Sequence, residues 1–445
     1  MSTVRIAGGQ GFYGDAPGPL ADVLAEEPAY VCLEALAELT LSVLAKDRAR
    51  DESLGYTRDL PLYLLELMPA VLAGRTKVIT NAGGINPVAA ARMVSQAADR
   101  FGFSGFTVAT VLGDDLRGRP EILPAGFPDA DALLFANAYL GARPVVAALE
   151  AGADLVITGR VADAALFLAP LVHEHGWSWD DWDRLAAGTV VGHLLECSGQ
   201  VTGGNHAGRW WDVPDPWRFA FPLADVASDG TAEIFKPADA GGRVDFDTVR
   251  QQLLYEVHDP AAYLTPDVVV DMTTLTLADL GADRVRVSGA SGAPRTGSYK
   301  VVGATADGYA AEASIAFGWP DAEAKARAAA DIARKRVAVA GLAVDDWHVE
   351  LFGVNALHGP AVPLHPAGQS DLAEVVLRLA WRCADSDTCA QVARHIVPLG
   401  LSAPPPGLTP ANRARPRPST QLALHTGLVD AAAVDPDVGV HVEEV

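Results

Sequence analysis

Short apolar runs alternate with amphipathic stretches over the first two hundred residues of the chain. Four of these stretches predict helices, at Glu34–Arg50, Val88–Arg100, Arg143–Ala151 and Val161–His173. Six apolar runs have the length of a strand: Val4–Ala7, Tyr30–Leu33, Lys77–Thr80, Phe106–Leu112, Leu133–Ala136 and Asp154–Thr158. Strands that alternate with helices are typical of βαβ units. Residues 1–205 are therefore expected to form an α/β domain with a mostly parallel, Rossmann-like sheet flanked by helices.

The pattern changes after about residue 206. Strand-like runs at Arg284–Ser288, Ser298–Gly303 and Tyr309–Phe317 precede helices predicted at Asp321–Ala338 and Asp371–Arg394. Further strands are predicted at His348–Val354 and Val438–Val442. We expect residues 206–445 to form a smaller α+β domain that completes the site or forms an interface.

Glycines and polar residues follow five of the six strands predicted in the first domain. Ligands of open α/β sheets bind at the carboxyl ends of the strands. Such residues also make ordinary turns, but turns do not require an arginine and several carboxylates on one edge. We therefore expect a ligand pocket at this edge. Its candidate residues are Gly11, Tyr13, Asp15, Asn81, Gly83, Gly84, Asn86, Asp114, Asn137, Arg160 and Asp163.

The side-chain types of these residues suit them to different roles. Asp15, Asp114 and Asp163 are candidate acid–base groups. Arg160 is suited to hold a carboxylate or phosphate through paired hydrogen bonds, and the other residues are candidate substrate contacts. Asp15, Asn81, Asp114, Asn137 and Arg160 are predicted to face one common cavity.

The loop after the first strand has the spacing of a dinucleotide-binding motif. Gly9, Gly11 and Gly14 form a GxGxxG pattern, and Glu34 stands where a ribose-binding acid would. Asp15, however, places a negative charge where a pyrophosphate should meet a helix N-terminus. Another polar ligand and a plain tight turn are the alternatives. We expect nicotinamide cofactors not to bind, and a nucleotide-binding Rossmann oxidoreductase is a less favoured function.

A second cluster lies in a helix predicted near residue 193. His193, Glu196 and Cys197 have i, i+3, i+4 spacing, so they share one helix face. That face suits a metal ion, an acid–base pair, a substrate contact or a buried histidine with a satisfied ring. We take His193 and Glu196 as candidate acid–base groups and assign no metal ligands. We expect Arg160 and His193 to serve a ligand and not the fold.

Small polar residues and glycines follow this helix directly. Gln200, Thr202 and Asn205 stand between Gly199, Gly203 and Gly204, and glycines allow a ligand to approach the backbone closely. The three polar residues are candidate substrate contacts.

Charge and hydropathy limit the class of protein. The 445 residues include 34 Lys and Arg against 56 Asp and Glu, a formal net charge of −22. A phosphate backbone would be repelled, apart from one short basic segment at 413–417, so nucleic acid is an unexpected partner. Apolar runs are too short for a membrane helix, and the N-terminus resembles no signal peptide. We expect a cytoplasmic protein without a membrane partner.

Ten segments spread along the chain resemble the acyclic terpene utilisation family, the AtuA-like proteins. They are Gly11–Asp15, Leu36–Thr40, Leu54–Tyr56, Thr80–Pro87, Ile157–Asp163, His173–Trp177, Gly192–Cys197, Thr202–Asn205, Gln252–Glu256 and Tyr263–Asp267. The resemblance implies a place in pathways that degrade citronellol- and geraniol-type terpenoids as coenzyme A thioesters. It assigns no reaction and no catalytic residue. Longer relatives carry a small ferredoxin-like domain that this chain is expected to lack, which leaves a separate ferredoxin-like subunit as a possible partner.

These observations favour a catabolic enzyme that acts by acid–base chemistry on a branched or terpenoid acyl substrate. Coenzyme A would enter as part of that substrate, and we expect a homo-oligomer. The alternative is a non-catalytic partner subunit or scaffold of such a pathway. Its contact surface would be a tryptophan-rich segment that contains Trp177, Trp179, Trp182, Trp210, Trp211 and Trp217. An enzyme should have a polar pocket at the converging loops, and a scaffold should have an exposed apolar patch.

Overall fold

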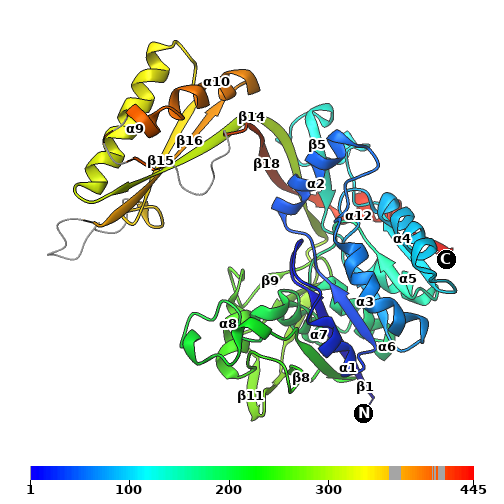
Figure 1. The fold of residues 1–445 in the computed structure, drawn as a ribbon. Helices are drawn as coiled ribbons and strands as arrows, with labels where there is room; N and C mark the ends of the chain where they lie inside the picture. The colour runs from blue at the N-terminus through cyan, green and yellow to red at the C-terminus, as the bar shows by residue number, and fades with distance from the viewer. Residues whose placement is uncertain (1, 360–371, 403, 405–406, 409–415) are drawn as a thin grey trace. The chain divides into compact units, whose positions relative to one another are not determined.

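The structure is a computed structural model, which describes residues 2–359, 372–402, 404, 407–408 and 416–445 (Figure 1). Packing divides the chain into two compact units. Unit 1 contains residues 1–304 and 425–445, and unit 2 contains residues 305–424. This division does not confirm the boundary expected at residue 205, because strands from both sides of that residue belong to one sheet.

Unit 1 is built on a ten-stranded sheet with the order β11-β12-β8-β7-β1-β2-β3-β6-β4-β19. Five strands are parallel, as βαβ connections require: β1 (Thr3–Gln10), β2 (Tyr30–Leu33), β3 (Lys77–Thr80), β6 (Leu155–Ile157) and β4 (Thr107–Leu112). The others pair antiparallel: β7 (Leu223–Ala227), β8 (Ala232–Phe235), β11 (Thr276–Gly281), β12 (Arg284–Ser288) and β19 (Gly439–Glu444). The sheet is therefore mixed, and the expectation of a mostly parallel sheet is corrected.

The fifth predicted strand does not join this sheet. β5 (Leu133–Ala138) pairs instead with β14 (Ser298–Gly318). Parallel neighbours need a crossover, usually through a helix, and only short 3₁₀ turns lie between β4 and β5. One bridge between Asp115 and Asn137 still ties the end of β5 to the segment after β4.

Helices cover both faces of the parallel strands (Figure 1). Because both faces are buried, the strands are continuously apolar, which is the pattern that identified them in the sequence. One face packs against α5 (Arg143–Glu150), α6 (Ala165–His175) and α7 (Trp182–Leu195). The other packs against α1 (Leu20–Ala25), α3 (Leu60–Leu72) and α4 (Pro87–Phe101).

Two predicted helices begin four residues later than expected. α2 is Glu38–Arg50 and α6 starts at Ala165, so the preceding residues are free to form loops at the strand ends. α4 is capped as its sequence indicates, since the Asn86 side chain accepts a hydrogen bond from the backbone N–H of Ala89.

A small sheet packs against α7 and brings a distant part of the chain to it. The sheet contains β13 (Ser291–Pro294), β10 (Val268–Asp271) and β9 (Tyr263–Leu264). α8 (Phe246–Leu254) precedes it and also contacts α7. The segment around residues 256–267 consequently lies beside α7.

Unit 2 has the element order β14, α9 (Ala322–Val339), β15 (Asp346–Phe352), β16 (Glu374–Cys383), α10 (Ser386–Ile396) and β17 (Gly407–Leu408). Its strands lie in the order β15-β16-β14-β17. This βαββαβ arrangement is ferredoxin-like. We expected no ferredoxin-like unit in this chain, and the topology of residues 305–424 corrects that expectation.

The helix predicted at Asp371–Arg394 is wrong over residues 374–383, and Asp371 lies outside the described residues. That segment forms β16, in which every second residue from Val375 to Cys383 is buried, a period of two. Val375 and Leu379 also fit one face of a helix, which explains the error. The closing strand predicted near Val438 is confirmed as β19.

The remaining elements are α11 (Leu399–Ser402), β18 (Ser419–Asp430) and α12 (Ala431–Val434). Arg413 and Arg415 of the basic segment lie outside the described residues. No helix in the part of the chain that the structure describes is long and apolar enough to cross a membrane.

Candidate active site

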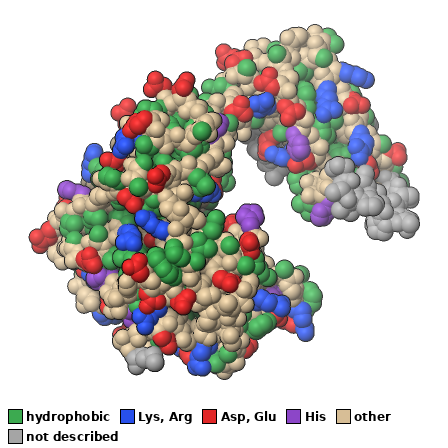
Figure 2. Space-filling view, turned by 180° about the vertical axis from the view of Figure 1, so that it is seen from behind, with side chains coloured by type: hydrophobic (Ala, Val, Ile, Leu, Met, Phe, Trp, Pro, Cys, Tyr) green, Lys and Arg blue, Asp and Glu red, His purple; other side chains and the backbone are tan. Residues whose placement is uncertain are grey.

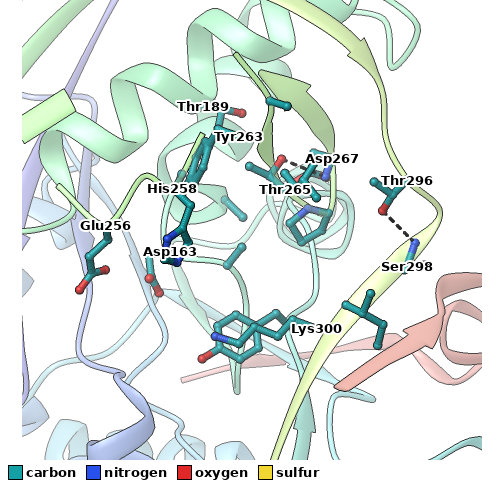
Figure 3. Close-up of a pocket in the computed structure, with 18 of the residues that line it drawn as sticks. Asp163, Thr189, Glu256, His258, Tyr263, Thr265, Asp267, Thr296, Ser298 and Lys300 are labelled. Atoms are coloured by element: carbon teal, nitrogen blue, oxygen red, sulfur yellow. Dashed lines mark hydrogen bonds between the residues drawn. The ribbon is translucent and has the colours of Figure 1, made fainter. Parts of the chain in front are cut away.

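A cavity of about 770 Å³ opens in unit 1 (Figure 3). Pockets of this volume commonly hold small-molecule ligands. We call it the Asp163 cavity. Its polar lining comes from segments far apart in the sequence: Tyr139, Asp163, Thr189, Glu256, His258, Asp259, Tyr263, Thr265, Asp267, Thr296, Ser298 and Lys300.

Asp163 lines this cavity and pairs with a buried arginine. Arg160 is only 1% exposed, and its Nη2 donates a hydrogen bond to Oδ1 of Asp163, whose side chain is 36% exposed. The other guanidinium nitrogens donate to the carbonyl groups of Val161 (Nε, 2.9 Å) and Leu36 (Nη1). Arg160 therefore positions Asp163 and does not itself line the cavity, contrary to its expected role as a ligand contact.

The ring of Tyr139 contacts both the guanidinium of Arg160 and the ammonium of Lys300. The two groups lie 4.2 Å and 4.8 Å from the centre of its ring. The Tyr139 hydroxyl and Lys300 Nζ each donate a 2.8 Å hydrogen bond to Oε1 of Glu38. Burial alone would raise the pKa of Glu38, but Lys300 and Tyr139 outweigh it and lower that pKa to about 2. Glu38 is thus an ionised anchor for two residues of the cavity wall.

Glu34 and Asn81 are committed to hydrogen bonds within the protein. Oε1 of Glu34 accepts from the N–H of Leu36 at 2.7 Å and from Nδ2 of Asn81 at 3.0 Å, and Oδ1 of Asn81 accepts from the N–H of Ala35. Burial, and then the charge of Asp163, raise the pKa of Glu34 well above its ordinary value although Arg160 opposes this. A buried, bonded carboxyl is poorly placed to bind a ribose, which weakens the dinucleotide hypothesis.

His193 and Glu196 form a buried pair beneath Tyr263. Nδ1 of His193 lies 2.9 Å from Oε1 of Glu196, and the histidine ring lies 5.6 Å from that of Tyr263. Burial would lower the pKa of His193, but Glu196 outweighs it and raises that pKa, while burial raises the pKa of Glu196. Neither residue lines the cavity, so the expectation that His193 contacts a ligand is not supported by its position.

Asp114 and Asn137 join the ends of three strands. Oδ2 of Asp114 accepts from the N–H of Arg160 at 2.7 Å and from Nδ2 of Asn137 at 2.8 Å. Both side chains are buried, and burial raises the pKa of Asp114 to about 6. These bonds fix the loop that presents Asp163.

Another group of predicted residues lines a separate cavity of about 820 Å³ in unit 1. It contains Gly11, Asp15, Gln200 and Asn205, and we call it the glycine-loop cavity. Five aromatic residues also line it: Phe12, Trp217, Phe219, Phe221 and Tyr255. The prediction of one common cavity is therefore wrong. Asp15 lines the glycine-loop cavity, whereas Asn81, Asp114, Asn137 and Arg160 are buried and line neither.

Asp15 and Thr202 hold the loops around this second cavity. The carboxylate of Asp15 accepts from the N–H of Gly11 at 3.1 Å and of Ala16 at 2.8 Å, and burial raises its pKa. The hydroxyl oxygen of Thr202 is buried and lies 2.8 Å from the carbonyl oxygen of Ala220 and 3.0 Å from that of Gly199, so its one hydrogen is directed between them.

The remaining candidates hold backbone turns together. Tyr13 accepts a long hydrogen bond from the N–H of Arg58. Gly84 has φ +58°, and a Cβ on Gly83 would lie 2.4 Å from the carbonyl oxygen of Thr158. Asn86 caps α4. These contacts explain the residue types without a ligand.

A family model described as acyclic terpene utilisation family protein AtuA matches residues 4–440. The chain belongs to this family. The resemblance is thereby confirmed, and the match extends over both units. Among curated proteins and among solved structures, none matches the chain.

Sequence reasoning missed most of the wall of the Asp163 cavity. Two signals existed, since Gln252–Glu256 and Tyr263–Asp267 are among the segments that resemble the family. They supply Glu256, Tyr263, Thr265 and Asp267 to the wall. Asp267 accepts from the N–H of Ala142 with both carboxylate oxygens, and burial raises its pKa to about 6.

The described residues contain no cluster of three or more histidine, cysteine, aspartate or glutamate side chains arranged to hold a metal ion. The Asp163 cavity offers the positioned carboxylate of Asp163, three further acidic side chains (Glu256, Asp259 and Asp267), an imidazole, two phenols and an ammonium group. Such groups can bind a polar substrate group and transfer protons.

Proposed function

We propose that this AtuA-family protein is a catabolic enzyme that binds a branched or terpenoid acyl substrate in the Asp163 cavity. Asp163 transfers a proton there. One observation carries the proposal: the partly exposed carboxylate of Asp163 lines the cavity and is held there by the buried guanidinium group of Arg160. A charged group fixed in this way is typical of a functional site.

The cavity wall suits a branched chain. Apolar residues of the wall come from residues 162–165, from residues 262–266 and from β18. They are Ala162, Ala164, Ala165, Ala262, Leu264, Pro266 and Leu428. Small alanines leave room for methyl branches, and contact with them removes apolar surface from water. Lys300 is drawn across the cavity from Thr265 and Asp267 in Figure 3, so polar groups bound the apolar surface.

The geometry favours proton transfer at the carbon next to an acyl carbonyl. Asp163 would accept the proton, and the electron pair would move onto the carbonyl oxygen. Lys300 lines the same cavity and supplies a positive charge for that oxygen. A coenzyme A thioester is one form of substrate with such an acidic carbon.

Hydrogen–deuterium exchange into the substrate tests this chemistry. The protein would be incubated in D₂O with branched acyl-CoA thioesters and with the free acids, and mass spectrometry would follow deuterium at carbon. We expect exchange with the wild type and at least a 100-fold slower rate for Asp163→Asn, since a general base contributes about 10²–10⁴. The matched control is Asp15→Asn in the glycine-loop cavity. Equal rates for wild type and Asp163→Asn would contradict the proposal.

Exposed tryptophans favour the alternative of a non-catalytic partner subunit. Trp210, Trp211 and Trp217 are 64%, 63% and 76% exposed, whereas Trp177 is buried. Exposed aromatic side chains are typical of interaction surfaces. The exchange assay separates the two functions, because a scaffold would give no substrate-dependent exchange with any variant.

A further inference from the structure

A third cavity of unit 1, about 600 Å³ in volume, is lined by positive charge. Three guanidinium groups line it, those of Arg48, Arg92 and Arg117, together with one acidic residue, Glu52. The chain as a whole carries a net charge of −22, and Figure 2 shows acidic side chains spread over the face that it displays. A local excess of arginine in an acidic protein indicates an anionic ligand.

The three guanidinium groups are engaged to different extents, and Arg117 is the most fully engaged, since each of its nitrogens donates a hydrogen bond. Arg48 is half-buried and uses Nη1 to bond the carbonyl of Ile85 at 2.8 Å. Arg117 pairs with Asp115 at 2.6 Å and bonds the carbonyl of Leu134. Arg92 is exposed on α4, and within the described ranges it has no hydrogen bond or ion pair. Two fixed guanidinium groups and one free one thus surround the same space.

The positive charges in this cavity oppose one another. Burial, and then the nearby charge of Arg117, lower the pKa of Arg48, with Asp115 and Glu52 acting in the other direction. An anion between the arginines would replace this repulsion by attraction. Guanidinium groups bind phosphate through paired, charge-assisted hydrogen bonds.

The N-terminus of α4 adds to the positive electrostatic potential of the same cavity. Asn86 and Ala89, in the first turn of this 15-residue helix, also line the cavity. Asn86 already accepts the hydrogen bond of Ala89, so the helix contributes its positive dipole and not a free donor at that position.

We propose that this arginine cavity binds a phosphate group. The proposal does not depend on the reaction in the Asp163 cavity. The phosphate can belong to a free phosphorylated compound or to the nucleotide part of coenzyme A. α2 connects the two regions, because Glu38 holds Lys300 near one end and Arg48 lies ten residues later, about 15 Å along the helix.

Calorimetric titration at low ionic strength tests the proposal with four probes: inorganic phosphate, pyrophosphate, adenosine 3′,5′-bisphosphate and coenzyme A. We expect pyrophosphate to bind the wild type, and Arg92→Gln to weaken it at least fivefold. The matched control is Arg100→Gln, on the same helix but outside the cavity, which should change affinity less than twofold. Added salt should weaken binding, because it screens the charges.

The probes also distinguish the two sources of phosphate. Competition of coenzyme A and adenosine bisphosphate with pyrophosphate, with the same loss in Arg92→Gln, assigns the site to a coenzyme A moiety. Binding of phosphate and pyrophosphate alone assigns it to a free phosphorylated compound. No binding of pyrophosphate or phosphate by the wild type, or equal losses for Arg92→Gln and Arg100→Gln, overturns the proposal. Asp163→Asn should bind pyrophosphate like the wild type, so failure of this site is distinguishable from failure of the proposed reaction.

Discussion

The Asp163 cavity and the glycine-loop cavity have similar volumes, about 770 and 820 Å³, and each contains an aspartate that follows a strand of the same sheet. Their surroundings differ. Asp163 is held by a buried arginine, whereas Asp15 is held by backbone N–H groups of its own loop. The first arrangement fixes a charged group toward a cavity. The second uses the carboxylate to shape the loop.

The comparison shows that an aspartate after a strand does not by itself define a catalytic position. The side chains packed beneath the loop decide the role of its aspartate. The guanidinium group of Arg160 is bonded to the carbonyl groups of Val161 and Leu36, which hold its charge beside Asp163. The cavity that Asp15 lines includes aromatic side chains, among them Phe12 and Trp217, which are well exposed.

The largest expected effect is on stability and follows from removing Arg160. Arg160→Ala would leave the neighbouring carboxyl groups of Asp163 and Glu34 without their positive partner. Removing one partner of a buried ion pair costs about 3–5 kcal/mol of unfolding free energy, and because Asp163 is partly exposed we expect a loss near the lower end of that range, about 3 kcal/mol. Urea unfolding measures it, with Arg58→Ala, an exposed arginine beside the glycine loop, as control. A loss below about 1 kcal/mol would show that Arg160 does not hold Asp163 in the way that distinguishes it from Asp15.

The next effect is on catalysis. Asp15→Asn should leave the rate of deuterium exchange within about twofold of wild type, whereas Asp163→Asn should lose about 100-fold or more. The reason is that only Asp163 lines the proposed reaction cavity. If Asp15→Asn caused the larger loss, the proposed reaction would belong to the glycine-loop cavity.

A smaller effect concerns pH. Burial raises the pKa of Asp114 to about 6, above the ordinary value near 4, so the folded state binds this proton more tightly than the unfolded state. Its contribution to stability is therefore present below about pH 4 and is lost as the pH rises through 6. Between pH 4 and 7 the wild type should lose unfolding free energy through this group. Asp114→Asn should lose about 1–3 kcal/mol less over the same range. An unchanged pH profile in denaturant titrations would show that Asp114 is not buried as described.

The smallest effect is expected at the rim of the glycine-loop cavity. Trp217→Ala removes a side chain that is 76% exposed, so unfolding free energy should change by no more than about 0.5 kcal/mol. Deuterium exchange should be unchanged as well. A large loss of stability, measured by thermal melting, would mean that the aromatic wall is part of a packed core.

Much of the local structure of unit 1 could be predicted from the sequence. β2 and β3 begin and end where their apolar runs do, and α4 begins at its capping asparagine. These features depend on neighbouring residues, through side-chain periodicity and capping. β16 shows the limit of that reasoning, because its apolar positions fit a helix face and an alternating strand equally well.

The candidate site was predicted less completely. Asp163 was identified because it follows a strand, but the burial of Arg160 and His193 was not. The direction of a side chain at a strand end depends on what packs beneath it, and that packing comes from distant segments. The wall of the Asp163 cavity combines Tyr139, Lys300 and Leu428, which no local pattern connects.

The sequence by itself determined the family, the alternation of strands and helices and the excess of acidic charge, because each is a property of composition or of neighbouring residues. Only the tertiary structure decided which strands pair, which carboxylates are buried and which residues share a cavity. β5 lies outside the parallel sheet because no α-helix connects it to β4. Lys300 lies beside Tyr139 because its strand, β14, pairs with β5. Such contacts form between residues more than a hundred positions apart, so they depend on the packing of the whole unit and not on local preference.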